Sequence, residues 1–205
     1  NQIRTGKISE KSYHKLQGAT KNSLKAAEEP TKLYTHNTDV DRINAEQLAK
    51  LPGVTKSFKA KTSGNKKLIE TLKKSVLAGE NLAFKIGAKV MFVKNDKEKR
   101  YVNGSLGTVI GFSDAGVPSV KLLDGRTVFA EKEDWSIADD SGKTLANYNQ
   151  IPLRLAWAIT VHKCQGMTLD AAEIDLSKTF EMGQGYVALS RLKKLESLKL
   201  KGLNE

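Results

Sequence analysis

The stretch TVHKCQG, residues 160–166, contains the only cysteine of the chain, Cys164, two residues after His162. A cysteine and a histidine can act as nucleophile and general base when their side chains meet. On a helix, residues two apart point about 200° away from each other. On a strand they share a face, but no third group is present to orient the histidine. We therefore expect Cys164 to fill space in a packed corner, as free cysteines usually do.

The polar residues around this cysteine suit a phosphate better than a scissile bond. Ligands of open α/β sheets collect at the carboxyl ends of strands, and polar residues follow two predicted strands here. They are Thr160, His162, Lys163, Gln165 and Gly166 after the first strand, and the turn Gly183-Gln184-Gly185 after the second. Arg191 comes later, in a predicted helix, next to Ser190. Such an arginine either forms a surface ion pair or reaches an anion at the sheet edge.

The segment SGKTL, residues 141–145, resembles the end of a phosphate-binding P-loop. The full motif, G-x-x-x-x-G-K-[ST], requires a glycine five residues before Gly142, where this chain has Ile137. The preceding DWSIADD is acidic and turn-like, so it would repel a triphosphate. We expect a turn here, and no nucleotide site.

The elements that must position the polar residues follow a βα pattern near both ends of the chain. Residues 7–25 are predicted to form an amphipathic helix led by Ser9, followed by a polar linker. TKLYTH (31–36) is a predicted strand, and a helix capped by Thr38 follows and ends at Pro52-Gly53. After residue 151, LRLAWA, AAEIDL and LESLKL are predicted strands, and GQGYVALSRLKK is a predicted helix. Strands that alternate with helices indicate parallel βα units.

The middle of the chain has a different pattern. Residues 54–84 are rich in lysine and contain one predicted helix around KKLIETLKKSVL. From Ile86, short strands follow every ten residues or so, separated by turns rich in Gly, Asp and Asn. This spacing predicts a small antiparallel β-barrel of SH3-like size, inserted between two parts of one α/β domain.

Composition narrows the possible partners and the compartment. The net charge is +11, and residues 50–100 hold fourteen Lys/Arg against four Asp/Glu. Such a block suits a polyanion, most plausibly nucleic acid, or it keeps a lysine-rich surface solvated. One cysteine precludes an internal disulfide, and the three histidines lack the spacing of a zinc site. The chain has no apolar run long enough for a membrane helix and no signal-peptide core, so we expect a cytoplasmic or nucleoid-associated protein that is not secreted.

LAWAITVHKCQGMTLD (155–170), followed by GQGYVALSRLKKLESLKL (183–200), resembles the last two motifs of superfamily 1B DNA helicases of the Pif-like group, relatives of Dda and RecD. TKLYTHNTDVDRIN (31–44) resembles the strand and helix that open the second RecA-like motor domain of that family. LAFKIGAKVMFVKN and VNGSLGTVIGF resemble its SH3-like insertion. The resemblance implies an α/β fold in which a RecA-like parallel-sheet domain carries a small SH3-like barrel. The expected parts are a linker and helix at 1–30, the motor domain at 31–84 and 149–205, and the barrel at 85–148.

The resemblance also implies roles for the candidate residues. Arg191 would be the arginine finger that reaches the γ-phosphate of ATP held by the other motor domain. Gln165 and Gly166 would lie beside the same phosphate, and Gln184, with Tyr186, would support the helix of the finger. The residues expected to grip the backbone of single-stranded DNA are Thr160, His162 and Lys163, with further contacts from Thr35 and Asn37.

The chain departs from the family pattern in one respect. It contains no G-x-x-x-x-G-K-[ST] and no acidic magnesium-binding strand end beside such a motif. The expected interpretation is the C-terminal motor half of a longer 5′–3′ DNA helicase, which the methionine-free start favours. The complete enzyme would use ATP and Mg²⁺, work as a monomer at a junction of single-stranded and duplex DNA, and take part in DNA repair and recombination, whereas this fragment alone would be inactive.

Three other interpretations stay open. The chain could be a degenerate helicase-like protein, or a non-catalytic nucleic-acid-binding module that uses the barrel and the lysine-rich segment. A cysteine-dependent hydrolase is the third, and it predicts inactivation by the change Cys164→Ser.

Overall fold

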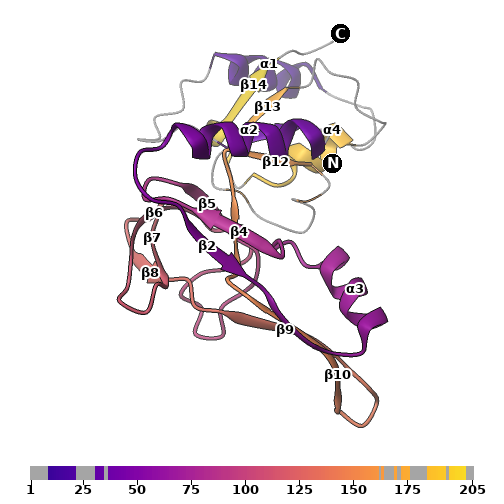
Figure 1. Ribbon diagram of the computed structural model, residues 1–205. Helices are drawn as coiled ribbons and strands as arrows, with labels where there is room; N and C mark the ends of the chain where they lie inside the picture. Colours follow the sequence, from indigo (N-terminus) through magenta and orange to yellow (C-terminus); the bar gives the residue numbers. More distant parts are fainter. Residues whose placement is uncertain are drawn as a thin grey trace. The chain divides into compact units, whose positions relative to one another are not determined.

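The computed structural model describes residues 9–21, 31–34, 37–161, 163, 169, 172–175, 184–192 and 194–201 (Figure 1). The chain forms two compact units, one from residues 1–47 and 156–205 and the other from residues 48–155. The second unit therefore interrupts the sequence of the first. Among the helices of the described residues, none is both long enough and apolar enough to cross a membrane.

A four-stranded parallel sheet lies at the centre of the first unit, in the order β12-β1-β13-β14. The strands are β1 (Thr31–Tyr34), β12 (Ala158–Thr160), β13 (Ala172–Asp175) and β14 (Leu198–Lys201). Leu33 of β1 is the register partner of Ile159 and Ile174, and all three side chains are buried. Because register partners point to the same face, these residues form an apolar layer. The parallel pairing confirms the α/β prediction for this part of the chain.

Helices connect and flank these strands. They are α1 (Glu10–Thr20), α2 (Asn37–Lys50), α4 (Gln184–Leu189) and the 3₁₀ helix η1 (Leu195–Ser197). Ser9 caps α1 as predicted, since its hydroxyl accepts a hydrogen bond from the Ser12 N–H. Leu16 and Ala19 are the buried residues of α1, and this helix lies against β14.

LRLAWA was predicted to be one strand of the α/β domain, but the structure divides the apolar run LRLAWAIT, residues 153–160, into two strands that belong to different units. β11 (Leu153–Leu155) pairs antiparallel with β5 (Lys89–Phe92) in the second unit. β12 starts at Ala158, after a break at Ala156-Trp157, and pairs parallel with β1. An apolar run indicates that its residues are buried, but it does not show which sheet buries them. The sequence pattern therefore does not reveal that the run is divided between two sheets.

Antiparallel strands build the second unit. The largest sheet has the order β11-β5-β6-β7-β8 and is a meander from β5 to β8. The other two sheets have the orders β3-β10-β9 and β2-β4. Their strands are β2 (Lys56–Lys59), β3 (Lys61–Gly64), β4 (Asn81–Phe84), β6 (Leu106–Phe112), β7 (Pro118–Leu122), β8 (Thr127–Phe129), β9 (Glu133–Ala138) and β10 (Thr144–Gln150). The antiparallel arrangement was predicted, while the closure of these strands into an SH3-like barrel stays a prediction.

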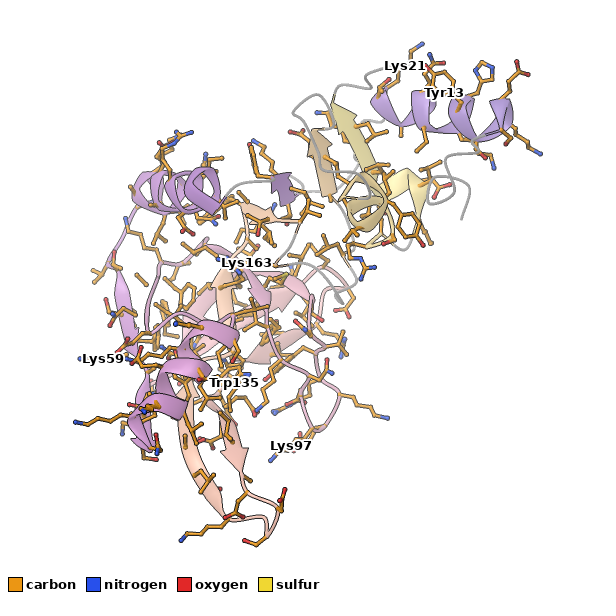
Figure 2. The ribbon with its side chains drawn as sticks, turned by 90° about the vertical axis from the view of Figure 1, so that its right-hand side faces the viewer. Tyr13, Lys21, Lys59, Lys97, Trp135 and Lys163 are labelled. Carbon is orange, nitrogen blue, oxygen red and sulfur yellow. The ribbon has the colours of Figure 1, made fainter. Side chains whose placement is uncertain are left out.

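The lysine-rich segment 54–84 packs within the second unit, which is therefore wider than the predicted insertion at 85–148. Helix α3 (Lys66–Ser75) buries Leu72 in a cluster with Ala60 and Tyr148, and Trp135 packs against this cluster (Figure 2). The Tyr148 hydroxyl donates a hydrogen bond to the Ala78 carbonyl at 2.9 Å, and burial raises the pKa of this phenol. These long-range contacts tie the segment to β10, and a sequence pattern alone does not show them.

Candidate nucleotide and nucleic-acid sites

The carboxyl ends of β1 and β12 lie side by side in the first unit, because Tyr34 and Thr160 are register partners. The pairing continues past β12, where the Val161 N–H donates to the Tyr34 carbonyl at 2.9 Å. The chain after β1 enters α2 at Asn37, and the chain after β12 enters a turn that contains Lys163. The sheet therefore brings two of the predicted DNA-contacting segments to one edge. Four of the predicted site residues lie outside the described residues: Thr35, His162, Gln165 and Gly166. Cys164 also lies outside them.

Thr160 has a structural role at this edge. Its side chain is buried, and its hydroxyl oxygen accepts a hydrogen bond from the Lys163 N–H at 3.3 Å. Hydrogen bonds of this kind shape turns. Thr160 thus helps to set the course of the chain toward Lys163, which is half-buried (Figure 2). A direct contact between the Thr160 hydroxyl and DNA stays a prediction.

Arg191 was predicted to lie within a helix. In the structure it lies in the turn that follows α4, because α4 ends at Leu189. The Arg191 Nε–H is shared between the Val187 carbonyl at 3.1 Å and the Ser190 hydroxyl at 3.2 Å. Nη2 donates to the same hydroxyl at 2.8 Å. Among the described residues, none accepts a hydrogen bond from Nη1. The guanidinium therefore lies folded over the end of its own helix, with donors left for an anion.

The backbone of Arg191 lies beside the segment that leads into β13. The Leu169 N–H donates to the Arg191 carbonyl at 2.8 Å, and Leu169 forms a parallel bridge with Leu192. Leu169 is three residues ahead of β13, whereas Thr160 ends β12. The sequence predicts that Arg191 reaches an anion at the edge where the strands end. The structure differs because α4 must return the chain to the start of the next parallel strand, so a residue that follows α4 lies near that start.

Gln184 and Arg191 stand at opposite ends of α4, since Gln184 is the first residue of this helix. The six residues of α4 span roughly 9 Å, and Arg191 lies in the turn beyond them. Support of the arginine by Gln184 would thus act through the helix, and that role stays a prediction.

Asn44 was not among the predicted site residues, although it contacts Ala158, the first residue of β12. Asn44 is buried and lies on the same face of α2 as Val40, which is buried, and Leu48, which is half-buried, because residues four apart share one face of a helix. A polar side chain in an apolar stripe is the sequence signal that could have identified it. Its contacts with β12 are described below.

A second candidate surface is a basic loop of the second unit, residues 93–104. The buried carboxylate of Asp96 accepts hydrogen bonds from the N–H groups of Glu98 and Arg100, at 3.2 and 3.0 Å. It also accepts two from the Arg100 guanidinium, each at 2.9 Å. The hydrogen bonds from Arg100 lower the pKa of Asp96 to about 2 against the opposing effect of burial. The loop presents the exposed side chains of Lys97 and Lys99 from this ordered base. Figure 2 labels Lys97.

We expect Asp96→Asn to lower the free energy of unfolding by about 1–3 kcal/mol at pH 7, because it removes charge-assisted acceptors from buried donors. The pKa of Asp96 is lower in the folded state, so its ionisation stabilises the fold above about pH 4. That contribution is lost as the pH falls from about 4 to 2. Thermal unfolding of both proteins from pH 7 to 2 tests this. The difference should disappear near pH 2, and a difference that is independent of pH would contradict it.

Ser141, Gly142 and Lys143 of the SGKTL segment lie in the turn of the β9–β10 hairpin, and Thr144 and Leu145 begin β10. The Asp139 carboxylate accepts hydrogen bonds from the Ser141 N–H and hydroxyl, at 3.0 and 2.6 Å, and from the Lys143 N–H at 3.0 Å. The hydrogen bond from the Ser141 hydroxyl is the main cause that lowers the pKa of Asp139, followed by the bond from the Lys143 N–H. Backbone donors that a P-loop would direct at phosphate thus bind a carboxylate of the same turn. The turn itself was expected, but the preceding DWSIA was predicted to be turn-like and instead lies in β9.

Comparisons with known proteins find one family model that matches the middle of the chain and relatives that match most of its length. The family model for the 2B domain of DNA helicase Pif1 matches residues 67–112. The chain is 48% identical over 225 residues to the ATP-dependent DNA helicase Pif1 of Psychrobacter sp. (strain PRwf-1), covering 85% of this chain and 34% of that protein. It is 39% identical over 202 residues to ATP-dependent DNA helicase PIF1 of Homo sapiens, covering 97% of this chain and 31% of that protein.

Solved structures extend this likeness to three dimensions. The chain matches Bacteroides sp Pif1 in complex with ADP-AlF4 with a TM-score of 0.84 and 32% sequence identity. The match covers 100% of this chain and 48% of that chain. The chain spans about a third of the length of these two curated relatives, which are 34% and 31% covered.

Proposed function

Because the chain belongs to the Pif-like group of superfamily 1B DNA helicases, we propose that it forms the second motor domain, with its inserted domain, of an ATP-dependent DNA helicase. The observation that carries this proposal is the 48% identity to a Pif1 helicase over 85% of the chain. The polar segment 160–166 and the Arg191 segment resemble two motifs of this family. In this proposal the inserted domain is an SH3-like barrel.

Arg191 would act on ATP held by a first motor domain. The γ-phosphate gains charge on its equatorial oxygens as it is transferred, and a guanidinium stabilises that charge with bidentate hydrogen bonds. To do so, Arg191 would exchange its bonds to Ser190 and Val187 for bonds to phosphate oxygens. Mg²⁺ would neutralise part of the phosphate charge, held by residues of the first motor domain. Among the described residues of this chain, no cluster of His, Cys, Asp or Glu could hold a metal ion.

Single-stranded DNA would lie along the edge where β1 and β12 end, held by the segments of Thr35 and Asn37 and of Thr160, His162 and Lys163. The connection from Thr160 to Leu169 carries the DNA contacts at one end and a backbone bond to Arg191 at the other. In this proposal Gln165 and Gly166 of the same connection contact the nucleotide. A movement of this connection would couple ATP hydrolysis to a step along DNA in the 5′–3′ direction.

The full-length protein tests this proposal directly. ATP hydrolysis is measured with and without single-stranded DNA, and unwinding is measured on duplexes with a 5′ tail or a 3′ tail. We expect hydrolysis that depends on DNA and unwinding of the 5′-tailed duplex only. Absence of DNA-dependent hydrolysis would overturn the motor proposal, and unwinding of only the 3′-tailed duplex would overturn the polarity.

Lys163→Ala is expected to weaken binding of oligo-dT by about tenfold. The plot of log K against log salt concentration should also become less steep, by roughly the contribution of one phosphate contact. His162→Ala should weaken DNA binding or stepping in a similar way. Fluorescence anisotropy at several salt concentrations measures both effects. Lys132→Ala, which removes an exposed lysine of the second unit, is the matched control. Equal losses in Lys163→Ala and Lys132→Ala would contradict a specific DNA contact.

A non-catalytic nucleic-acid-binding module is the second candidate function. It is favoured by the ordered loop that presents Lys97 and Lys99, and by the lysine-rich segment that packs in the same unit. This function requires salt-dependent DNA binding by the isolated chain and no loss of function on Arg191→Ala in the full-length protein.

A further inference from the structure

β12 is an edge strand of the parallel sheet and is only three residues long. Its pairing with β1 uses the Trp157 carbonyl, which accepts from the Lys32 N–H at 2.9 Å, and the Val161 N–H. Backbone groups alternate in direction along a strand, so both groups of Ala158 point away from β1. An outward N–H and C=O at a buried position must find other partners.

Asn44 of α2 supplies both partners. Its Nδ2 donates to the Ala158 carbonyl at 2.9 Å, and the Ala158 N–H donates to its Oδ1 at 3.0 Å. The Asn44 side chain is 5% exposed and Ala158 is 0% exposed. The carboxamide thus pairs with β12 as one residue of a further strand would.

This contact joins the two chain segments that carry the proposed DNA contacts. α2 begins at Asn37, and the turn that leads to Lys163 starts directly after β12. On one side, β12 pairs with β1, and this pairing aligns the β1–α2 segment with the turn after β12. On its other side, β12 is hydrogen-bonded to the Asn44 side chain. Hydrogen bonds depend on direction, so this paired amide resists sliding of β12 along its axis more strongly than an apolar contact would.

We propose that Asn44 is a positioning residue for single-stranded DNA, which keeps the β1–α2 segment and the turn after β12 at the spacing that one DNA backbone requires. The inference rests on the proposed function, because it assumes that both segments bind DNA. Arg191 is held through Leu169 instead, so the nucleotide site does not depend on this contact.

The test uses the full-length protein with Asn44→Leu, which keeps the side-chain size and removes both hydrogen bonds. We expect the Kd for oligo-dT and the DNA concentration for half-maximal ATP hydrolysis to rise about tenfold, with the KM for ATP within twofold of wild type. Leu16→Ala is the matched control, because it removes buried apolar contacts of α1 in the same unit without touching β12. It should lower the thermal midpoint and leave the Kd for DNA within twofold of wild type.

Asn44→Asp provides a second test that does not depend on the stability of the leucine variant. An ionised carboxyl accepts from the Ala158 N–H but repels the Ala158 carbonyl, whereas a protonated carboxyl can also donate to it. Burial beside a carbonyl raises the pKa of such a carboxyl. DNA affinity relative to wild type should therefore be reduced at pH 8 and recover on acidification to pH 6.

The outcomes separate this inference from the proposed function. Unchanged DNA affinity in Asn44→Leu, with weakened affinity in Lys163→Ala, overturns the inference and leaves the DNA site in place. Unchanged affinity in both variants overturns the DNA site and the inference with it. An equal loss in Leu16→Ala, or an Asn44→Asp defect that does not vary with pH, also overturns the inference.

Discussion

Arg191→Ala is expected to reduce DNA-stimulated ATP hydrolysis of the full-length protein by roughly 10³-fold or more, the usual contribution of an arginine finger. Single-stranded DNA binding should stay within about threefold of wild type, because the arginine lies beside Leu169 and not at the edge where β1 and β12 end. Steady-state ATPase assays and anisotropy with oligo-dT measure the two properties separately.

Two further variants show which property of Arg191 matters. Arg191→Lys keeps the charge but loses the planar fork, so we expect most of the rate to be lost. Arg42→Ala is the control, since Arg42 lies on the exposed side of α2 and pairs with Glu46 at 2.8 Å. Its ATPase rate should be near that of wild type. A near-normal rate in Arg191→Ala would refute the finger assignment and favour the binding-module function.

Gln150→Leu is expected to lower the free energy of unfolding by about 3 kcal/mol, through loss of hydrogen bonds to buried groups. The side chain is fully buried, and its Nε2 donates to the carbonyls of Gly79 and Glu80 at 3.0 and 3.1 Å. It also reaches the Phe58 carbonyl at 3.2 Å, while Oε1 accepts from the Ile151 N–H at 2.9 Å. Leucine fills a similar volume but leaves these groups without their partner.

Urea unfolding followed by circular dichroism measures this effect, with two variants of the same strand as comparisons. Asn149→Ala removes an exposed amide that donates to Asp134, and should cost less than about 1 kcal/mol. Tyr148→Phe removes only the bond to the Ala78 carbonyl, and should cost about 1–2 kcal/mol. Gln150→Leu as stable as wild type would show that Gln150 does not hold residues 58–80 onto β10.

Local signals in the sequence were enough to locate most elements. Ser9 marks the start of α1 because a serine side chain satisfies a free backbone N–H of the first turn. The alternation of strands and helices at the two ends of the chain indicates parallel units, and β1, β12, β13 and β14 are all parallel. Neighbouring residues carry this information, so it can be read without knowing the fold.

The candidate site was predicted only in part. The strands that lead to Asn37 and Lys163 end side by side, as parallel strands require, while the roles of these residues stay predictions. The position of Arg191 differed from the prediction, because it depends on where α4 ends and on the bridge between Leu169 and Leu192. Asn44 was missed, since its partner Ala158 lies 114 residues later in the chain.

The sequence by itself determined the βα pattern of the first unit, the antiparallel strands of the second, and the family motifs on which the helicase proposal rests. These follow from residue types at short spacings. Only the tertiary structure decided that LRLAWAIT divides between two sheets, that residues 54–84 join the second unit, and that an amide of α2 completes the edge of β12. Each of these three features depends on contacts between segments that are far apart in the sequence. Hydrophobic periodicity indicates that a segment is buried but not which distant segment it pairs with.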